Sequence, residues 1–317
     1  MGFLYSQFFV TPAYPTRSFA GETVIVTGAN VGLGKEAARH ITRLGASKVI
    51  LACRNTTAGE EAKHDIVSTT KVNPATIEVW QLDLNSYDSI KDFANRASAL
   101  PRIDVLLENA AIATSNFQLV NGHESTVTVN VISTFLLALL MLPKLKETSK
   151  QYNVQPRLVI VSSEVHSYTD LPERKAPNTF DELDNQSTAN MSQRYPTSKL
   201  LEVLVVREIA PKLNGSGVIL NMLNPGLCHS SLSRNTAGLQ GIVFWLMKTL
   251  LARSTEVGSR TLVAGAAADE DSHGEYMHDA MVADEAVSSF VKSEDGKKTS
   301  QKIWTELKEV LEKIEPV

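Results

Sequence analysis

The chain has 317 residues, 43% hydrophobic and 21% charged, a composition typical of one large globular α/β domain. Its net charge of −4 and the scatter of its 31 Lys and Arg residues argue against a nucleic-acid-binding surface. Two cysteines, Cys53 and Cys228, are too few for a disulfide framework or a Cys/His metal cluster. We therefore expect no metal site, no nucleic-acid partner, and a reducing, cytoplasmic location.

Residues 1–20 are predicted to form an arm ahead of the domain. The arm is mildly apolar, but two prolines interrupt it, and it lacks the basic start and the length of a signal peptide or a membrane span. Met1-Gly2 followed by Ser6 formally matches the myristoylation pattern, but the bulky Phe3 disfavours that modification. We expect an arm packed on the body of the protein and no transmembrane segment.

From Glu22 onward, short β-branched runs alternate with amphipathic stretches, the pattern of successive βα units in a parallel sheet. We expect strands at Thr23–Val26, Lys48–Cys53, Ile77–Leu82, Ile103–Leu107, Arg157–Val161 and Val218–Leu223. We expect helices at Lys35–Leu44, from near Ala58, at Ser86–Ala99, around Val127–Leu142, from near Ser192 and at Thr299–Ile314. The pattern predicts a doubly wound parallel sheet in three αβα layers, as a single domain covering residues 21–317.

Two irregular regions interrupt this pattern. Residues 164–194 form a long polar stretch that we expect to be a loop, and loops of this length are uncommon unless they cover a site. Residues 227–253 contain the apolar run Gly241–Met247, which is too short to span a bilayer. That run is either core or a lid over a substrate.

A glycine-rich loop joins the first strand to the first helix, with the sequence Thr27-Gly28-Ala29-Asn30-Val31-Gly32-Leu33-Gly34. Glycines there let the backbone approach a pyrophosphate, which rests on the partial positive charge of the helix N-terminus. Three glycines alone are a weak signal and also occur in ordinary tight turns. Their position between a strand and a helix favours a dinucleotide site.

The end of the second strand indicates which nicotinamide cofactor to expect. No Asp or Glu lies there to bind the adenosine ribose hydroxyls, whereas Arg54 can pair a 2′-phosphate with its planar fork, and Asn30 and Lys35 could assist. We therefore expect NADP(H), although a solvated surface arginine is the usual fate of a single Arg. Asp83, after the third strand, either accepts a hydrogen bond from the adenine amino group or caps the next helix.

Tyr195 and Lys199 lie at i and i+4 of a predicted helix, and so on one face. A nearby cation lowers the pKa of a phenol from its usual value of about 10, and a phenol so tuned can exchange a proton with an alkoxide. The spacing alone is common. It gains weight from Ser163, at the end of the fifth strand, and from Asn130, a polar residue in an apolar helix. Asn130 is either a satisfied core amide or the anchor of a water chain to Lys199.

In this order, these residues resemble the short-chain dehydrogenase/reductase superfamily, from about Phe19 to Ile314. The resemblance implies a Rossmann-type fold in which Ser163 polarises a carbonyl and Tyr195 donates or accepts the proton. It implies that Lys199 binds the nicotinamide ribose and lowers the Tyr195 pKa, and that Asn130 holds a relay water. NADP(H) would be bound by Gly28, Asn30, Gly32, Leu33, Gly34, Lys35, Arg54, Asp83, Leu84, Asn109, Ala110, Tyr195, Lys199, Pro225, Gly226 and Ser230.

Within the superfamily, the chain is most similar to retinol-dehydrogenase-like and fungal short-chain reductases, on the signals Leu51–Asn55, Ser198-Lys199-Leu200, Gly274-Glu275-Tyr276, Trp304 and Phe8–Pro12. This implies an enzyme acting on CH–OH groups, namely a ketoreductase for a lipophilic or polycyclic, natural-product-like carbonyl or alcohol. Two alternatives stay open: an isomerase or cyclase with structural NADP(H), and a non-enzymatic NADP(H)-binding regulator. Homo-oligomers are common on this scaffold, through long helices carrying residues such as Phe135, Leu136 and Leu140.

Two departures from the family pattern stand out. Glu108 and Ala111 lie where the family usually has Asn and Gly, and we expect the Glu108 carboxylate at the sheet edge near the cofactor. The segment from Ser163 to Tyr195 is also longer than in many relatives. Substrate positioning therefore cannot be carried over from the family.

Overall fold

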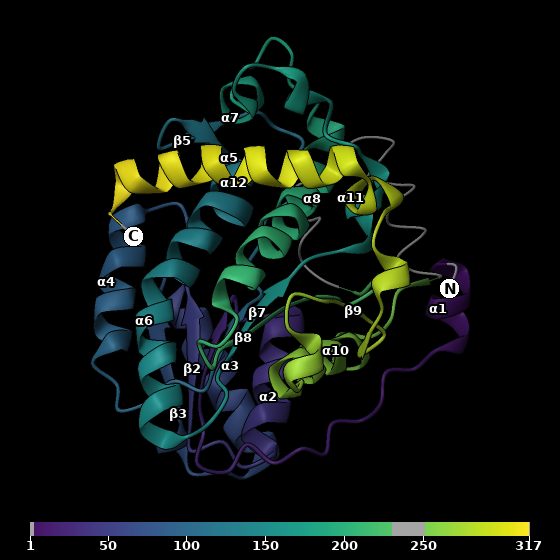
Figure 1. The fold of residues 1–317 in the computed structure, drawn as a ribbon. Helices are drawn as coiled ribbons and strands as arrows, with labels where there is room; N and C mark the ends of the chain where they lie inside the picture. The colour runs from purple at the N-terminus through teal and green to yellow at the C-terminus, as the bar shows by residue number, and fades with distance from the viewer. Residues whose placement is uncertain (1–2, 230–250, 317) are drawn as a thin grey trace.

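The computed structural model describes residues 3–229 and 251–316. At its centre lies an eight-stranded sheet in the order β10-β9-β8-β7-β4-β1-β2-β3 (Figure 1). The strands are β1 (Thr23–Thr27), β2 (Lys48–Cys53), β3 (Ile77–Gln81), β4 (Val105–Glu108), β7 (Arg157–Val161), β8 (Ile219–Asn224), β9 (Tyr276–His278) and β10 (Met281–Val282). All neighbours pair in parallel except β10, which runs antiparallel to β9. The predicted doubly wound, Rossmann-type sheet is confirmed.

The strands are apolar on both faces because helices cover both faces. Successive side chains of a strand point to opposite sides. In β1, Val24 and Val26 therefore belong to one hydrophobic cluster and Ile25 to the other. The same alternation holds in β2, where Ile50 and Leu51 lie on opposite faces.

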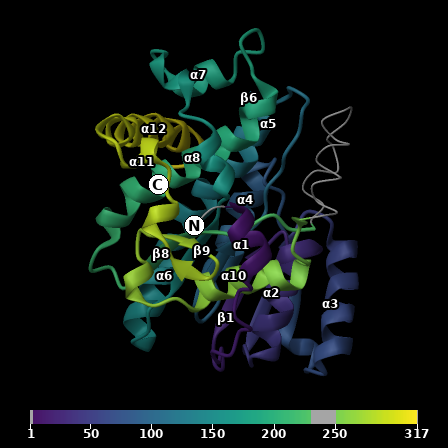
Figure 2. The ribbon, with the colours of Figure 1, turned by 90° about the vertical axis from the view of Figure 1, so that its right-hand side faces the viewer.

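Two layers of helices complete the domain (Figures 1 and 2). One face is covered by α2 (Gly32–Arg43), α3 (Thr56–Thr70) and α10 (Thr255–Ala267). The other is covered by α4 (Tyr87–Ser98), α6 (Thr134–Tyr152) and α8 (Met191–Ile209), and α12 (Glu294–Ile314) packs across α8. As predicted for the last helix, Ile303, Leu307 and Leu311 are fully buried.

The long central helix belongs to the core. It begins with α5 (Ser125–Val127), passes through a π-helical turn at Thr128–Ser133, and continues as α6. Ser125–Tyr152 is long and apolar enough to cross a membrane, but 89% of its most apolar window is buried inside the fold. Phe135 and Leu136, expected either in the core or at an oligomer surface, are also in the core.

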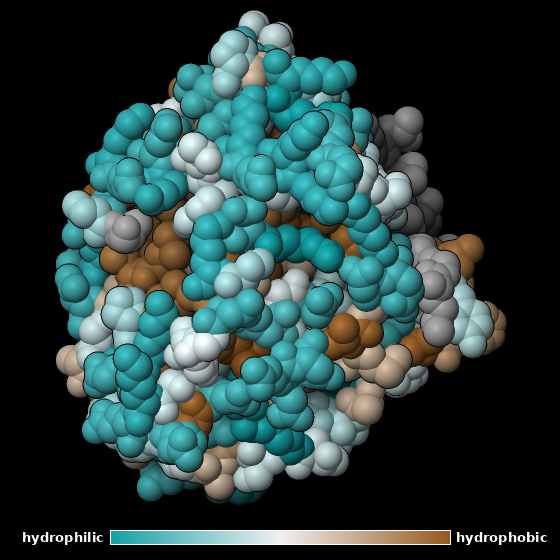
Figure 3. Space-filling view, viewed as in Figure 1, coloured by the Kyte–Doolittle hydropathy of each residue, from teal (hydrophilic) through white to brown (hydrophobic). Residues whose placement is uncertain are grey.

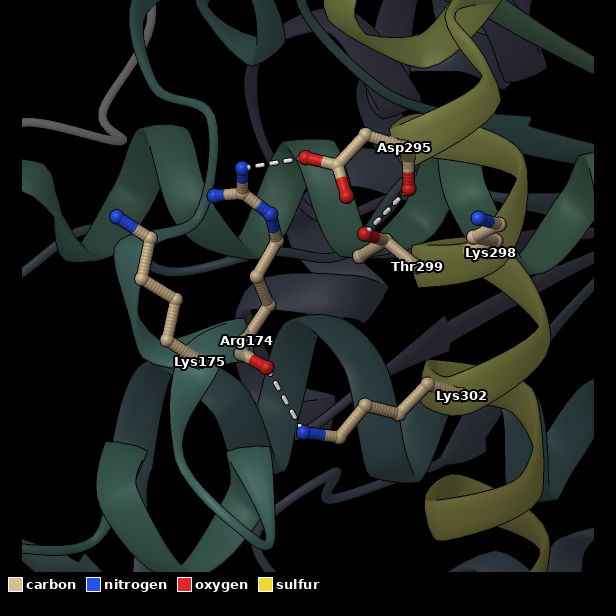
Figure 4. A pocket seen from close by; sticks show the side chains of 6 residues that line it. All are labelled: Arg174, Lys175, Asp295, Lys298, Thr299 and Lys302. Atoms are coloured by element: carbon tan, nitrogen blue, oxygen red, sulfur yellow. Dashed lines mark hydrogen bonds and ion pairs between the residues drawn. The ribbon is translucent and has the colours of Figure 1, made fainter.

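The segment 164–194, expected to be a loop, contains short helices. These are 3₁₀ turns at Glu164–Tyr168 and Pro172–Lys175, and α7 (Thr179–Leu183), which Asn178 caps. Lys302 on α12 donates to the Arg174 carbonyl (2.8 Å), and Arg174 pairs with Asp295 (2.6 Å), as Figure 4 shows. The prolines and acidic residues of this segment predicted a loop. Its short helical turns are stabilised by contacts with α12, which the sequence pattern does not show.

The same contacts border a surface hollow of about 280 Å³ between the second 3₁₀ turn and α12 (Figure 4). It is lined by Arg174, Lys175, Asp295, Lys298, Thr299 and Lys302. None of these is a predicted site residue. Arg174 and Lys302 already use their charged groups in contacts between the second 3₁₀ turn and α12. We therefore assign the hollow a structural role.

The short elements that the sequence did not indicate include α1 (Phe3–Phe9), α11 (Ser289–Lys292), strands β9 and β10, and the ribbon of β5 (Leu119–Val120) with β6 (His123–Glu124). Helix α1 packs on the body as predicted for the arm, and its other side exposes Leu4, Tyr5, Phe8 and Phe9. Figure 3 shows hydrophobic surface at that edge of the molecule. The apolar run 241–247 lies outside the described residues.

Candidate active site

The three predicted catalytic residues lie together at the carboxyl edge of the sheet. Ser163 follows β7, and its hydroxyl is close enough to the Tyr195 hydroxyl to lower the pKa of that phenol. Lys199 lies one turn further along α8, with its Nζ 5.6 Å from the centre of the Tyr195 ring. The shared helical face expected from the i, i+4 spacing is therefore present.

Tyr195 is a protonated phenol in this state of the protein. Burial raises its pKa above the ordinary 10.0, the Lys199 ammonium opposes this, the Glu202 carboxyl adds to it, and the Ser163 hydroxyl opposes it. The net direction is upward, so burial outweighs the lowering by Lys199 that the sequence predicts. At neutral pH Tyr195 can donate a proton and cannot yet accept one.

Lys199 is fixed by two buried contacts. Its Nζ donates to the Val161 carbonyl (2.9 Å) and to Oε1 of Glu202 (2.7 Å), and both Lys199 and Glu202 are 2% exposed. Burial lowers the pKa of Lys199, but the carboxyl of Glu202 outweighs burial and raises it. Lys199 therefore remains an ammonium, and one of its three hydrogens is left for a ligand.

Glu108 lies at the carboxyl edge of the sheet, where the sequence placed it, but its side chain is buried. It ends β4 and is 4% exposed, and neither carboxyl oxygen has a hydrogen-bond partner among the described residues. Burial raises its pKa well above the usual value, and the nearby Glu202 adds to this. The strand extends one residue beyond the predicted end at Leu107, and Glu108 is buried there; its nearness to the cofactor stays a prediction.

Asn130 has the contacts of a satisfied core amide. Its Nδ2 donates to the Ile112 carbonyl (2.9 Å) and to Ser198 Oγ (3.0 Å), and its Oδ1 accepts from the Ile112 N–H (2.9 Å). It lies in the π-helical turn, a distortion common at functional sites. Its contact with Ser198 ties that turn to α8 beside Lys199, while the predicted relay water stays a prediction.

The glycine loop packs tightly against the end of β4. Asn109 Nδ2 donates to the Thr27 carbonyl (2.9 Å), and the Thr27 hydroxyl accepts from the N–H groups of Asn109 and Ala110. A Cβ on Gly34 would lie 2.5 Å from Asn109 Nδ2, whereas one on Gly32, at φ +64°, would meet no atom of the described residues within 4 Å. Gly34 is thus required for packing, and Gly32 borders open space.

The N-terminus of α2 is suited to a phosphate. Its N-cap residue, Val31, makes no side-chain capping bond, whereas Asn55 and Ser86 cap α3 and α4. The first N–H groups of a helix need a partner, and an anion is favoured there. The open space at Gly32 lies beside these groups, so this end of the sheet fits a dinucleotide pyrophosphate.

The residues predicted to bind the adenosine part of the cofactor differ in how far their side chains are already engaged by the protein. Arg54 is exposed after β2, as a phosphate ligand or a solvated arginine would be, but Lys35 is already paired with Asp65 (2.7 Å). Asp83 Oδ1 accepts from the backbone and side chain of Asn85. Since Ser86 caps α4, the alternative that Asp83 caps this helix was wrong. Leu84 is buried in one hydrophobic cluster, Leu33 packs against the other, and Asn30 is half-buried in the glycine loop.

The N-terminal helix contacts the turn at Pro225 and Gly226, which is predicted to bind the cofactor, and the sequence did not indicate this contact. Pro225 and Gly226 follow β8, and a Cβ on Gly226, at φ +75°, would lie 2.7 Å from Gln7 Oε1. Gln7 accepts from the Leu227 N–H and donates to the carbonyls of Leu227 and Leu251. Ser230, predicted in this subsite, lies outside the described residues.

Arg253 secures the same helix. Its guanidinium donates to the Ser6 and Val10 carbonyls and pairs with Asp279 at 2.7 Å. Buried Glu202, Gln7 and Arg253 are therefore the residues near the predicted site that sequence reasoning missed. A visible signal existed only for Glu202, an acidic residue within an apolar stretch of helix. Within the described residues, no group of three His, Cys, Asp or Glu is placed to hold a metal.

Comparison with known proteins shows the family of the chain. Residues 22–169 match the short chain dehydrogenase family. The chain is 49% identical over 323 residues to short chain dehydrogenase/reductase dmxR8 of Cryptosporiopsis sp., which covers 100% of this chain and 98% of that protein. It is 45% identical over 322 residues to short-chain dehydrogenase anuD of Penicillium roqueforti. That alignment covers 100% of this chain and 84% of anuD.

Solved structures support the fold. A crystal structure of an uncharacterized protein from Mycobacterium paratuberculosis is 25% identical, with a TM-score of 0.69 over 94% of this chain and 96% of that one. An NADPH-bound carbonyl reductase from chicken fatty liver is 20% identical, with a TM-score of 0.62 over 84% and 99%. At that identity the second likeness concerns the fold alone.

Proposed function

The chain belongs to the short-chain dehydrogenase/reductase family, and from this premise we propose that it is an NADP(H)-dependent ketoreductase with Tyr195 as proton donor. In this proposal Lys199 holds the nicotinamide ribose and Ser163 polarises the carbonyl. The arm 1–20 and the domain 21–317, with the segments 164–194 and 227–253 around the substrate, act as one cytoplasmic enzyme.

The observation that carries the proposal is the Ser163–Tyr195–Lys199 cluster. The substrate carbonyl would accept hydrogen bonds from the Ser163 and Tyr195 hydroxyls, which already lie within hydrogen-bonding reach of each other. Because the pKa of Tyr195 is raised, the phenol is protonated and ready to neutralise an alkoxide. A protonated donor is what carbonyl reduction requires, whereas alcohol oxidation requires a base.

The cofactor would supply the hydride, and the chain supplies its binding and orientation. The uncapped N-terminus of α2 and the open space at Gly32 would take the pyrophosphate, with Arg54 at the 2′-phosphate. The carboxamide would lie against Pro225 and Gly226. Lys199 keeps one hydrogen free for a ribose hydroxyl.

The substrate class is the least constrained part of the proposal. The relatives dmxR8 and anuD are fungal short-chain dehydrogenases by name, and the names state no substrate. We propose a lipophilic or polycyclic carbonyl on the basis of the apolar run 241–247, which lies between the described ends of the segment 227–253.

The test is an NADPH-consumption screen over aromatic ketones, retinoids and polyketide-like carbonyls, with NADH as the comparison. Oxidation of NADPH by at least one carbonyl, with a matching amount of alcohol formed, is expected. A product formed without net NADPH consumption would favour an isomerase or cyclase. NADPH binding without turnover of any carbonyl in the screen would favour a binding role.

A further inference from the structure

A buried acidic pair lies behind the predicted catalytic lysine. Glu202 is three residues after Lys199 on α8, and its Oε1 accepts from Nζ at 2.7 Å. Glu108 comes from β4, a different element, and is near enough to Glu202 for the two carboxyls to repel each other. All three side chains are at least nine-tenths buried.

The cluster has one cation for two carboxyl groups. A buried carboxylate is stable only where a cation or several donors compensate its charge. Glu202 has the ammonium of Lys199, but both oxygens of Glu108 lack a partner within the described residues. The second oxygen of Glu202, Oε2, is also unpartnered there, since the nearby Ser162 hydroxyl donates instead to the Lys199 carbonyl (3.1 Å).

These facts point to one way of distributing the charges. If Glu108 retains a proton, the buried group without a cation is neutral. Above the pKa of Glu202, which burial raises to about 7, Glu202 then carries the negative charge of the pair and binds the Lys199 ammonium. The upward shift of the Glu108 pKa, caused by burial and by Glu202, agrees with this distribution.

We propose that Glu202 is a positioning residue that holds the Lys199 ammonium and, through its charge, sets the pH at which Tyr195 exchanges its proton, while Glu108 is its neutral, proton-holding partner. This inference rests on the proposed function for its catalytic meaning. Its structural content, which is the charge state of the two carboxyls, does not.

The direction of the effect on Tyr195 follows from the groups that face it. Lys199 and Glu202 face it from α8, Ser163 from the end of β7, and the buried Tyr276 from β9. The Glu202 charge keeps the proton on Tyr195, because a phenolate beside a carboxylate is disfavoured. Tyr276, which also faces Glu164 and Glu202, has a pKa raised well above its ordinary value by burial and stays neutral.

The decisive experiment compares Glu202→Gln with the matched variant Glu108→Gln, since both keep shape and remove an ionisable group. Ultraviolet titration of phenolate absorbance, taken as the difference from the same background carrying Tyr195→Phe, reports Tyr195 without any substrate. We expect Glu202→Gln to weaken proton binding by Tyr195 about tenfold, as expected for loss of a neighbouring charge. We expect Glu108→Gln to change it less than twofold.

Infrared difference spectra test the neutral carboxyl directly. At a pH above about 7, where Glu202 is ionised, the wild type should still show the C=O band of a protonated carboxylic acid, and Glu108→Gln should lose it. No such band, or an equal shift of the Tyr195 titration in both variants, would overturn the role of Glu108. An unchanged titration in Glu202→Gln would overturn the role of Glu202.

Activity measurements separate this inference from the proposed function. With a carbonyl substrate in hand, the alkaline limb of kcat/KM for reduction should move to lower pH in Glu202→Gln and stay in place in Glu108→Gln. If no carbonyl is reduced but the titration shifts as expected, the proposed function fails and the inference stands. If Glu202→Gln does not fold, the infrared comparison of wild type with Glu108→Gln still decides whether the pair holds a proton.

Discussion

The Lys199 ammonium lies 5.6 Å from the centre of the Tyr195 ring, and on its other side it is bound to Glu202 at 2.7 Å. The lysine therefore joins two groups whose effects on the phenol are opposite. The ammonium favours the phenolate, whereas the carboxyl and burial favour the phenol. Since the sum favours the phenol, the resting site holds its proton, and only a further positive charge, such as an oxidised nicotinamide ring, would release it.

Tyr195→Phe tests the proton donor. Phenylalanine keeps the ring and its packing but has no proton to give, so kcat/KM for NADPH-dependent reduction should fall about 10²- to 10⁴-fold. NADPH affinity, followed by fluorescence titration, should change little. Tyr152→Phe, at the far end of α6, is the matched control and should keep its activity. Equal turnover in Tyr195→Phe and wild type would contradict the assignment.

Arg54→Ala tests the choice of cofactor. If the guanidinium binds the 2′-phosphate, its loss should raise KM for NADPH about 10- to 100-fold, equivalent to roughly 1.5–3 kcal/mol for a hydrogen bond to a charged group. KM for NADH should stay where it is, because NADH has no 2′-phosphate. Arg207→Ala, which removes a guanidinium paired with Asp284 elsewhere on the surface, is the control. A parallel rise of both KM values would instead indicate general damage to the site.

The parts of the fold that the sequence predicts best are those with strong local signals. The strands Lys48–Cys53 and Arg157–Val161 have the predicted bounds, because each is a buried apolar run whose composition changes abruptly at both ends. The site residues could also be predicted in their order along the chain, since each follows a strand or lies on a helix. Local pattern and tertiary structure agree at these places.

The missed parts depend on contacts that are distant in sequence. Helix α10 contains Gly258 and Gly265, which weaken a helical pattern, yet a Cβ at either position would lie under 3.0 Å from a neighbouring side chain. Strand β9 has three residues and forms only because β8 is beside it. The burial of Glu108 and its meeting with Glu202 likewise require the sheet and α8 to be packed together.

The pH dependence of stability should reveal Glu202. Burial raises the pKa of Glu202 to about 7, and Lys199 only partly opposes this. Between the usual carboxyl pKa of 4.5 and about 7, the folded protein holds a proton that the unfolded chain has lost, so stability from this group falls as pH rises through that window. Buried His166, whose pKa burial lowers, acts in the opposite direction, so the total curve mixes both.

The difference in unfolding free energy between wild type and Glu202→Gln, measured by urea denaturation at several pH values, isolates the effect. The wild type should lose stability relative to the variant from about pH 4.5 to about pH 7. A difference that stays constant across this range would show that Glu202 is ionised throughout.

Gln7→Ala tests whether the N-terminal helix belongs to the nicotinamide subsite. The Gln7 amide holds Leu227 by two hydrogen bonds and Leu251 by one, and so fixes the turn that carries Gly226. Losing these bonds should cost about 1–3 kcal/mol and weaken NADPH binding about tenfold, with little change for adenosine 2′,5′-bisphosphate, which lacks the nicotinamide. Phe9→Ala is the control on the same helix, because Phe9 is 75% exposed. Equal loss for both ligands would place the effect outside the nicotinamide end.

Two glycine variants in one loop separate packing from cofactor binding. In Gly34→Ala the new methyl would lie 2.5 Å from Asn109 Nδ2 and 2.7 Å from the Gly28 carbonyl, so the loop must move and the protein without cofactor should lose about 1–3 kcal/mol of stability. In Gly32→Ala the methyl meets no atom of residues 3–229 or 251–316, and the cost is that of a left-handed backbone, about 1–2 kcal/mol.

The two variants should diverge when NADPH is added. Thermal unfolding of Gly34→Ala should still rise with NADPH, because ligand binding stabilises any protein that retains the site. Gly32→Ala should show little or no rise, since its methyl occupies the space beside the uncapped N-terminus of α2 where the pyrophosphate would lie. A full NADPH-dependent rise in Gly32→Ala would mean that the pyrophosphate does not bind at this helix end. The cofactor assignments for the whole loop would then have to be revised.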